Sequence, residues 1–284
     1  MLLTKDIDTL VAFINIKGIS IDREHEDAVY VTVNAGENWH EFVLWCISQG
    51  FGGLENLSLI PGNVGTCPIQ NIGAYGVEVK DTITRVEAIE INTGKHVSFS
   101  NAACQFGYRN SIFKNEAKGR YILTAVCFKL TKKKHQLNTS YGAIETALKT
   151  QNISNPTLQD ISNAVISIRN SKLPNPKELG NSGSFFKNPV ISKEHFGKLQ
   201  QRYPSIPSYP ISETAIKVPA GWLVEQSGFK GKRFGDAGVH EKQALVLVNY
   251  GEASGMEILN LATKIQQTVL KKFEVALEIE VNIV

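Results

Sequence analysis

Residues 60–76 form the segment of this sequence that is best suited to binding a ligand through its backbone. They place four glycines and two prolines within seventeen positions. Because glycine has no Cβ atom, backbone N–H groups can converge there on an anionic or planar ligand, and Thr66, Gln70 and Asn71 could add neutral hydrogen bonds. The segment has neither the lysine of a P-loop nor a GxGxxG pattern, which excludes both of those nucleotide sites. An elaborate structural loop is the alternative.

Two further segments carry single residues that could take part in a reaction. Arg109 lies among aromatic residues in FGYRNSIFK. A half-buried arginine usually needs an anion, which could be a ligand or a structural carboxylate. Ser184 lies in GNSGSFFKNP, which differs from the GxSxG elbow of hydrolases, and no histidine adjacent in sequence could activate it as a nucleophile. A plain turn is the alternative for this segment.

Hydrophobic periodicity predicts the elements that must position these residues in the first half of the chain. Residues 28–33 alternate as a half-buried strand does, and Trp39, Phe42, Val43, Cys46 and Ile47 follow at helical spacing before a helix end at Gly50. Residues 83–91 and 96–99, joined by a turn at 92–94, predict a β-hairpin. Residues 121–130 predict another strand.

The second half of the chain mixes helices and strands. Thr157 can cap a helix that carries Ile161, Val165 and Ile168 and ends near Pro174 and Pro176. Residues 243–249 predict a strand, and a capping box of Ser254 and Glu257 opens a helix with one apolar face. The last residues, 276–284, predict a strand with apolar side chains on one face and with Glu278, Glu280 and Asn282 on the other.

Composition and charge narrow the class of protein. The chain has 284 residues, a formal net charge of +3 and 42% hydrophobic residues, so we expect a folded protein of two or three packed units. Its basic runs are short and lack interleaved aromatic residues, which argues against nucleic-acid binding. The four cysteines show neither a CxxC pair nor zinc-ligand spacing, so we predict reduced thiols and no metal. Without a leader-like start or a long apolar stretch, a cytoplasmic location is expected.

Five segments in chain order resemble the UDP-N-acetylenolpyruvoylglucosamine reductases, also called UDP-N-acetylmuramate dehydrogenases. They are IPGNVGTCPIQNIGAYG, FGYRNSIFK, GNSGSFFKNP, AGWLVEQSGFKG and LEIEV, and the resemblance covers essentially the whole chain. The Tyr141-Gly142 pair suits the subtype that closes a tyrosine loop over its substrate. The resemblance implies an α+β fold, in which a multi-domain FAD-binding part of the vanillyl-alcohol-oxidase type is joined to a C-terminal α/β substrate-binding domain.

The resemblance also implies a reaction and its catalytic residues. NADPH reduces bound FAD, and the enolpyruvyl ether of UDP-N-acetylglucosamine is then reduced to UDP-N-acetylmuramate. Negative charge that develops beside the substrate carboxylate needs a fixed cation and a proton donor. The matching motifs assign the cation to Arg109, the proton donor to Ser184 and stabilisation of the enolic intermediate to Glu280.

Binding residues follow from the same matching of motifs. Tyr141, Lys172, Asn188 and Gln226 would bind the UDP-sugar, with Glu225 a weaker candidate. The flavin contacts are expected from the glycine-rich segment, at Gly62, Gly65, Thr66, Pro68, Ile69, Gln70, Asn71, Gly73 and Tyr75. Cys67 stands where relatives often have a serine, so a hydroxyl contact at that position is not expected.

One departure from the family pattern concerns the start of the chain. Members normally begin with a further βαβ-like unit and a glycine-rich turn for the FAD diphosphate. We therefore expect residues 1–19 and 275–284 to be a remnant of a first FAD-binding subdomain. Residues 20–140 would form the second such subdomain, 141–169 the tyrosine loop with a connecting helix, and 170–274 the UDP-sugar domain.

Two alternatives to a working monomeric reductase stay open at this point. A chain that lacks part of its flavin domain could bind the UDP-sugar without holding FAD and be inactive. The chain could also be another flavoenzyme of the same broad fold, such as an oxidase of sugars or lactones, although Arg109, Ser184 and Glu280 in their motifs argue against it.

Overall fold

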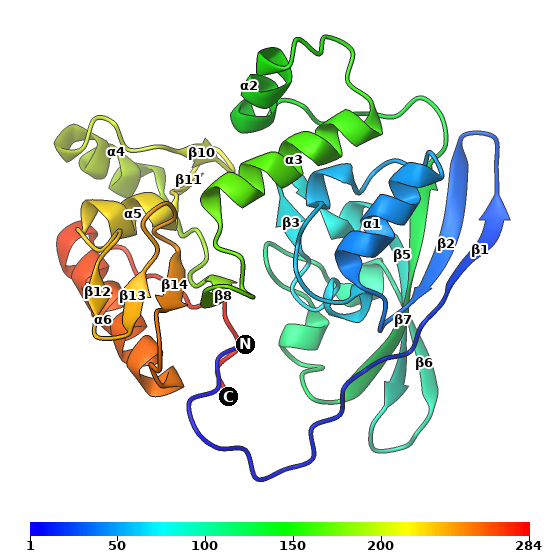
Figure 1. Cartoon of the computed structure of the whole chain (residues 1–284), viewed down its shortest axis with the longest axis horizontal. Coiled ribbons are helices and arrows are strands. Elements are labelled where there is room, and N and C mark those ends of the chain that lie inside the picture. Colours follow the sequence, from blue (N-terminus) through cyan, green and yellow to red (C-terminus); the bar gives the residue numbers. More distant parts are fainter. The chain divides into compact units, whose positions relative to one another are not determined.

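A computed structural model describes the whole chain, residues 1–284, and divides it into two compact units. One unit comprises residues 11–169 (Figure 1). The other comprises residues 1–10 together with 170–284. The two terminal segments, 1–10 and 275–284, thus belong to the same unit as residues 170–274.

A five-stranded antiparallel sheet is the framework of the unit 11–169. Its strand order is β1-β2-β7-β5-β6, with bounds Ile19–Glu24, Ala28–Asn34, Tyr121–Thr131, Ile83–Glu90 and His96–Ser100. The alternation predicted for residues 28–33 is confirmed, because Val29, Val31 and Val33 are fully buried and their neighbours in β2 are half exposed. The predicted strand 121–130 and the predicted hairpin are also confirmed, as β7 and as the pair β5–β6.

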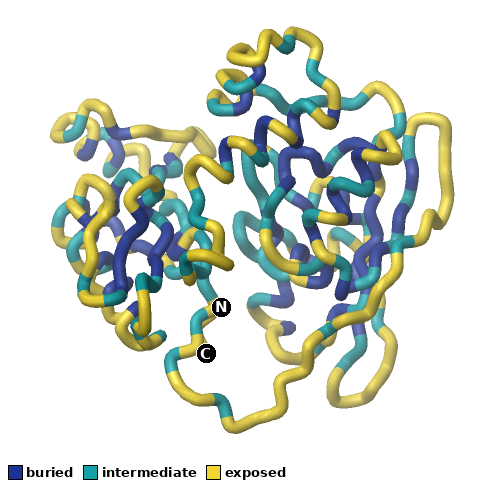
Figure 2. Tube along the Cα trace, in the orientation of Figure 1, coloured by how far each residue is buried: buried dark blue, intermediate teal, exposed yellow.

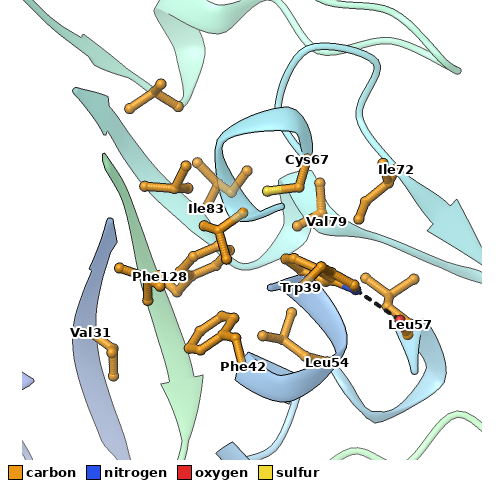
Figure 3. Close-up of a cluster of buried hydrophobic side chains, with 14 of the residues drawn as sticks. Val31, Trp39, Phe42, Leu54, Leu57, Cys67, Ile72, Val79, Ile83 and Phe128 are labelled. Atoms are coloured by element: carbon orange, nitrogen blue, oxygen red, sulfur yellow. Dashed lines mark hydrogen bonds between the residues drawn. The ribbon is translucent and has the colours of Figure 1, made fainter. Parts of the chain in front are cut away.

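Helix α1 (Trp39–Ser48) packs its apolar side chains into the core of this unit (Figure 3). Trp39, Phe42 and Phe128 of β7 are all nearly inaccessible, and the ring centroids of Phe42 and Phe128 lie 5.1 Å apart. The buried indole N–H of Trp39 donates to the carbonyl of Leu57 at 2.9 Å, which ties the helix to the chain just before the glycine-rich segment. The predicted helix is therefore confirmed, and its core carries the segment that follows.

Two more helices follow β7 in this unit. They are α2 (Gly142–Thr150) and α3 (Leu158–Lys172), and their apolar faces form a small second core. The helix predicted after Thr157 is confirmed, with Ile161, Val165 and Ile168 all buried. The short strands β3 (Gly73–Ala74) and β4 (Val77–Glu78) form a separate two-stranded pair at the end of the glycine-rich segment.

The lysines 132–134 all form ion pairs with acidic residues near the β1–β2 turn. Lys132 pairs with Glu24, Lys133 with Glu26 at 3.5 Å and Lys134 with Asp27 at 3.3 Å. Their charge is therefore balanced locally.

The unit of residues 1–10 and 170–284 contains two small antiparallel sheets. One has the order β12-β13-β14-β8, with bounds Arg233–Phe234, Ala237–Val239, Val246–Asn249 and Gly180–Ser184. The other has the order β10-β11-β9, with bounds Tyr209–Pro210, Ala215–Lys217 and Val190–Ser192. Its helices are α4 (Lys193–Arg202), α5 (Ala220–Gln226) and α6 (Gly255–Phe273).

Helix α6 begins as its sequence predicts. The Ser254 hydroxyl accepts from the Glu257 amide at 3.3 Å, and the Glu257 carboxylate accepts from the Ser254 amide at 2.8 Å. Ile258, Leu261, Ile265 and Val269 are buried on the face that packs into the core of this unit. Figure 2 shows how buried and exposed residues are distributed along the whole chain.

Two strand predictions in this unit were partly wrong. The strand predicted over 243–249 begins only at Val246, because the Val246 amide donates to the Gln243 carbonyl at 3.0 Å and closes a turn. The strand predicted over 276–284 is reduced to two isolated bridges, Phe186 with Ile279 and Leu2 with Ile283. Its alternating burial is kept as far as Ile279, since Leu277 is buried and Glu278 is exposed.

Candidate functional site

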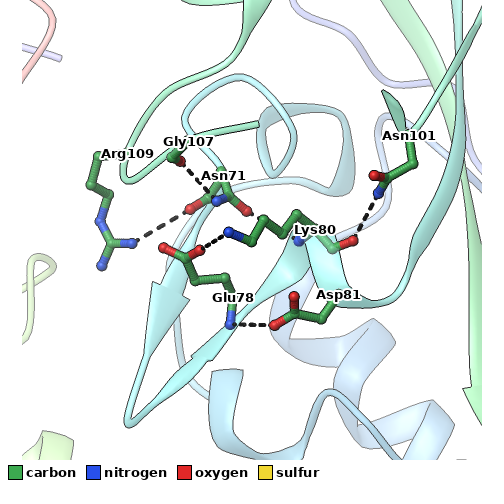
Figure 4. Close-up of polar contacts among 7 residues, drawn as sticks. All are labelled: Asn71, Glu78, Lys80, Asp81, Asn101, Gly107 and Arg109. Carbon is green, nitrogen blue, oxygen red and sulfur yellow. Dashed lines mark hydrogen bonds and ion pairs between the residues drawn. The ribbon is translucent and has the colours of Figure 1, made fainter. Parts of the chain in front are cut away.

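The side chain of Arg109 lies across the end of the glycine-rich segment (Figure 4). Its Nη1 donates to the carbonyl of Asn71 at 3.4 Å and its Nη2 donates to the carbonyl of Gly73. Its own backbone is left-handed, with φ +52°, in a tight turn closed between Gly107 and Asn110. The structure therefore brings two of the predicted segments together, with a guanidinium group held by neutral carbonyl oxygens.

Asn71 joins the same two segments through its own side chain. It is completely buried and left-handed, with φ +45°. Its Nδ2 donates to the carbonyl of Gly107 at 2.9 Å, and its Oδ1 accepts from the amide of Lys80 at 3.1 Å. Both ends of the amide group are thus used within the protein, so the visible role of this predicted flavin contact is to fix the turn that carries Arg109.

Other parts of the glycine-rich segment have unused hydrogen-bonding groups. The amides of Gly62 and Asn63 donate to no group of the protein, and the half-exposed side chain of Gln70 makes no hydrogen bond. Gly62 is exposed with φ +114°, a conformation that residues with a Cβ atom rarely adopt. These groups fit an anionic or polar planar ligand such as FAD, because they supply free donors on a backbone that is already fixed.

Several predicted flavin residues are instead packed inside the unit. Gly65 is buried, and a Cβ atom there would lie 2.6 Å from the Cβ of Ala35. Pro68 is also buried, whereas Ile69 and Gly73 are half-buried. Thr66 is exposed, but its hydroxyl donates to the carbonyl of Asn63 at 2.7 Å. The flavin assignments of these residues stay predictions.

Cys67 is another residue of the glycine-rich segment that is packed inside the unit. Cys67 is 1% exposed, and burial raises the pKa of its thiol well above the ordinary value. Burial also raises the pKa of Cys104, to about 12. All four cysteines are free, as predicted for reduced thiols. Cys67 therefore belongs to the core beneath the glycine-rich segment.

Tyr75 and Tyr141 meet edge to face at the other end of this segment. Their ring centroids lie 5.3 Å apart at an interplanar angle of 88°. Tyr141 is 40% exposed and immediately precedes α2. The structure thus places a predicted substrate residue against a predicted flavin residue.

Sequence reasoning missed two polar side chains behind the glycine-rich segment. Arg169 of α3 donates through Nε to the carbonyl of Leu59 at 3.1 Å, and its guanidinium interacts electrostatically with the phenol of Tyr75. His40 of α1 accepts the Leu59 amide at Nδ1, at 3.0 Å. The sequence did hold a signal for Arg169, because this arginine directly follows Ile168, one of the apolar positions that the helix buries. For His40, which lies between buried residues of α1, no comparable signal was present.

Ser184 and Glu280 come close along the backbone of the other unit. Ser184 ends β8, and the amide of Glu280 donates to the carbonyl of Phe185 at 2.9 Å. This bond and the one from the Lys187 amide to the Glu278 carbonyl, at 2.9 Å, form the bridge between Phe186 and Ile279. Two predicted catalytic residues are therefore adjacent, although they are distant in sequence, whereas Arg109 belongs to the unit 11–169.

The remaining predicted substrate residues lie apart from one another, at or near the ends of helices. The Oδ1 atom of Asn188 accepts the amide of Ala220 at 2.9 Å, at the first residue of α5. Gln226 is the last residue of α5, and Glu225 pairs with Lys230 at 2.9 Å. Lys172 ends α3 and is exposed. No contact connects Lys172, Asn188 and Gln226 with one another.

Family models match both parts of this architecture. A model described as the FAD binding domain matches residues 4–100, which include the glycine-rich segment. A model described as the C-terminal domain of UDP-N-acetylenolpyruvoylglucosamine reductase matches residues 175–284. The fold and the loop geometry therefore define a FAD-binding protein of the α+β class.

Curated relatives identify the family. A UDP-N-acetylenolpyruvoylglucosamine reductase from Flavobacterium johnsoniae is 61% identical over 284 residues, which are 100% of this chain and 84% of the relative. Another from Chromobacterium violaceum is 52% identical over 99% of this chain and 82% of the relative. The chain belongs to the UDP-N-acetylenolpyruvoylglucosamine reductase family.

A solved structure agrees at the level of the fold. The crystal structure of the UDP-N-acetylenolpyruvylglucosamine reductase from Thermus caldophilus is similar with a TM-score of 0.60. The match covers 89% of this chain and 71% of that chain at 24% sequence identity.

Proposed function

We propose that this chain catalyses the NADPH-dependent, FAD-mediated reduction of UDP-N-acetylglucosamine enolpyruvate to UDP-N-acetylmuramate, a step of peptidoglycan precursor synthesis. The observation that carries the proposal is 61% identity to a reductase of this name along the whole chain. The match of residues 4–100 to a FAD binding domain favours this enzyme over the alternative of a chain that binds the UDP-sugar but not FAD.

The glycine-rich segment would hold the cofactor. The unused amides of Gly62 and Asn63 and the side chain of Gln70 are the groups best placed to donate to it. FAD, when bound, supplies the hydride that is added to the enolpyruvyl group. The buried residues Gly65, Cys67 and Pro68 keep the backbone of the segment in place.

Arg109 is assigned the substrate carboxylate. Its guanidinium is fixed at the carbonyls of Asn71 and Gly73. A fixed cation stabilises the negative charge that spreads into the carboxylate during reduction, and its position needs no rearrangement at that moment. In this proposal the positive charge of Arg109 stabilises the negative charge that develops on the substrate.

Ser184 is assigned the proton donor, with Glu280 beside it. The backbone pairing of Glu280 with Phe185 places the two residues next to each other, which supports their assignment to one reaction centre. A serine hydroxyl is a weak acid in water, so it can donate only to a strongly basic carbon in a polarising environment. Glu280 would help stabilise the enolic form from its position near Ser184.

The UDP-sugar would be bound by Tyr141, Lys172, Asn188 and Gln226. Lys172 is exposed and suits the charge of a diphosphate. Asn188 has its Nδ2 group left to donate, since only its Oδ1 is used at the start of α5.

The location and assembly complete the proposal. No helix of the structure is both long and apolar enough to cross a membrane. We place the enzyme in the cytoplasm, where nucleotide sugars and NADPH are available, and as a monomer.

The visible spectrum of the bound flavin tests the function directly. The protein is purified with added FAD, then mixed without oxygen with NADPH and afterwards with the enolpyruvyl UDP-sugar. The expected result is a flavin absorbance that is bleached by NADPH and recovers with the UDP-sugar. Bound flavin that bleaches but never recovers would favour another flavoenzyme, and absence of bound flavin would favour the chain that binds only the UDP-sugar.

A further inference from the structure

One side chain, Arg169 of α3, interacts with the chain at both ends of the glycine-rich segment. Its Nε donates to the carbonyl of Leu59, the residue before Ile60, at 3.1 Å. Its guanidinium also interacts electrostatically with the phenol of Tyr75, near the other end of the segment. The sequence separation between Arg169 and Leu59 is 110 residues, so α3 fastens a loop that a distant part of the chain supplies.

The partners of Arg169 are neutral, which is unusual for a largely enclosed guanidinium. No carboxylate lies within ion-pair distance of it, and its partners are the carbonyl of Leu59 and the phenol of Tyr75. Burial accordingly lowers the pKa of Arg169 and raises the pKa of Tyr75. A desolvated cation is unfavourable unless its donors are used, so the geometry of Arg169 is restrained by the Leu59 carbonyl that it bonds and by its interaction with the Tyr75 phenol.

The backbone that Arg169 holds is itself strained. Leu59 is left-handed with φ +59°, a conformation that is unfavourable for a residue with a branched side chain. Such residues persist only where their surroundings fix them. Leu59 is fixed from both sides, because His40 accepts its amide at 3.0 Å while Arg169 donates to its carbonyl.

Tyr75, near the other end of the glycine-rich segment, is also a left-handed residue that its neighbours hold in place. Tyr75 is left-handed with φ +50°, and its ring packs edge to face on Tyr141 at 5.3 Å. The phenol end of this ring interacts with the guanidinium of Arg169. Arg169 therefore restrains a strained residue at each end of the segment and, through Tyr75, the residue assigned to the tyrosine loop.

We propose that Arg169 is a positioning residue that pre-organises the glycine-rich segment and Tyr75 for the flavin. This inference rests on the proposed function for the identity of the ligand. The unused amides of Gly62 and Asn63 lie three and four residues beyond Leu59, so the direction of these donors depends on the backbone that Arg169 holds. Loss of the restraint would leave the donors in place but distributed over several orientations.

The test compares Arg169→Met with Arg169→Lys and with the matched control Arg120→Met. Arg120 is an exposed arginine of the same unit, paired with Glu90 at 3.4 Å, and is not connected to the segment. The first measurement is amide hydrogen exchange in the protein without ligand. Arg169→Met is expected to accelerate exchange within residues 59–76 by about tenfold or more while the β2 and β7 amides are unchanged. Unchanged exchange across 59–76 would overturn the proposal.

The second measurement is the dissociation constant and the visible absorption spectrum of bound FAD. Arg169→Met is expected to bind FAD about tenfold or more weakly and to shift the flavin bands, because losing the hydrogen bond to Leu59 and the interaction with Tyr75 disorders the ligand-facing backbone. Arg169→Lys is expected to recover part of both effects, since an ammonium group can still reach one oxygen but lacks the planar fork. A spectrum and affinity equal to those of Arg120→Met would contradict the assignment.

A double-mutant cycle with Tyr75→Phe separates the two contacts. Tyr75→Phe removes only the phenol oxygen, so Arg169→Met is expected to add less in the Tyr75→Phe background than in the native protein. Strictly additive exchange effects would show that the two residues act independently and would refute the restraint. If the native protein bound no flavin, the proposed function would fail, whereas the exchange experiment would still decide the role of Arg169.

Discussion

Nη1 of Arg109 lies 3.4 Å from the carbonyl oxygen of Asn71, and the side chain of Asn71 in turn bonds the turn that carries Arg109 (Figure 4). The two residues thus hold each other across a separation of 38 positions. The proposed catalytic cation is consequently fixed by the same segment that is proposed to hold the flavin.

Replacing Arg109 tests its proposed role in the second half-reaction, in which the enolpyruvyl UDP-sugar reoxidises the flavin. Arg109→Ala is expected to leave reduction of FAD by NADPH within about twofold of native and to slow flavin reoxidation by the enolpyruvyl UDP-sugar by about a hundredfold or more. Stopped-flow absorbance measures the two steps separately. Unchanged reoxidation would remove Arg109 from the carboxylate role.

Two substitutions of Asn71 distinguish the contribution of its side-chain hydrogen bonds from that of its backbone conformation. Asn71→Gly keeps a residue that tolerates φ +45° but removes both side-chain hydrogen bonds, whereas Asn71→Ala also adds backbone strain. We expect a lower unfolding free energy by about 1–3 kcal/mol for Asn71→Gly, because two partly buried backbone groups lose their partner, and a larger loss for Asn71→Ala. Denaturant unfolding gives both values. Equal stability of Asn71→Gly and the native protein would show that the cross-link does not stabilise the fold.

The proton donor can be tested without disturbing the fold. Ser184 is exposed at the end of β8 and its hydroxyl makes no hydrogen bond within the protein, so Ser184→Ala is expected to keep native stability. Reduction by NADPH should be preserved, while reoxidation by the UDP-sugar should fall by two orders of magnitude or more, roughly the contribution of a general acid. Normal reoxidation in Ser184→Ala would assign the proton to another group.

Close packing explains why Gly65 has no side chain. In Gly65→Ala the new Cβ would meet the Cβ of Ala35 at 2.6 Å, so one of the two backbones must shift. We expect the unfolding free energy to fall by about 1–3 kcal/mol, as for other overpacked sites. Gly142→Ala is the control, because nothing lies within 4 Å of its added Cβ. A thermal midpoint of Gly65→Ala equal to that of the control would contradict the packing argument.

His40 makes the stability of the unit 11–169 depend on pH. Its Nδ1 accepts the Leu59 amide, so the bonded imidazole is neutral, and burial lowers its pKa, with Arg169 acting in the same direction and Glu41 opposing. A lowered pKa in the folded state means that the stabilisation is complete above the unfolded value of about 6.5 and is lost as the pH falls from there through the folded pKa.

The control for this effect is His40→Asn, which can accept the same amide but does not titrate. Thermal midpoints of both proteins should run parallel above about pH 7 and diverge below about pH 6, where only the native protein loses the His40 contribution. His240, whose pKa burial also lowers, is present in both proteins and cancels in the comparison. Parallel curves down to pH 5 would show that the His40 bond does not contribute.

The amino-acid sequence by itself determined the local elements of this protein. The alternation in β2, the helical spacing of Trp39, Phe42 and Cys46 in α1 and the capping box at Ser254 all act over a few residues, and the structure contains each of them. Long motifs in a fixed order identified the family, which the relatives confirm. The strand expected over 276–284 was not formed as a regular strand, because the alternating pattern cannot reveal whether a neighbouring strand pairs along its whole length.

Only the tertiary structure decided which groups hold the glycine-rich segment in place. Leu59 is bonded by His40, 19 positions before it, and by Arg169, 110 positions after it. No local propensity encodes such contacts, and the left-handed backbone of Leu59 opposes the preference of its residue type, whereas asparagine at position 71 adopts this conformation more readily. Burial and long-range hydrogen bonds stabilise these conformations, so the geometry proposed to bind the flavin arises when distant segments pack together.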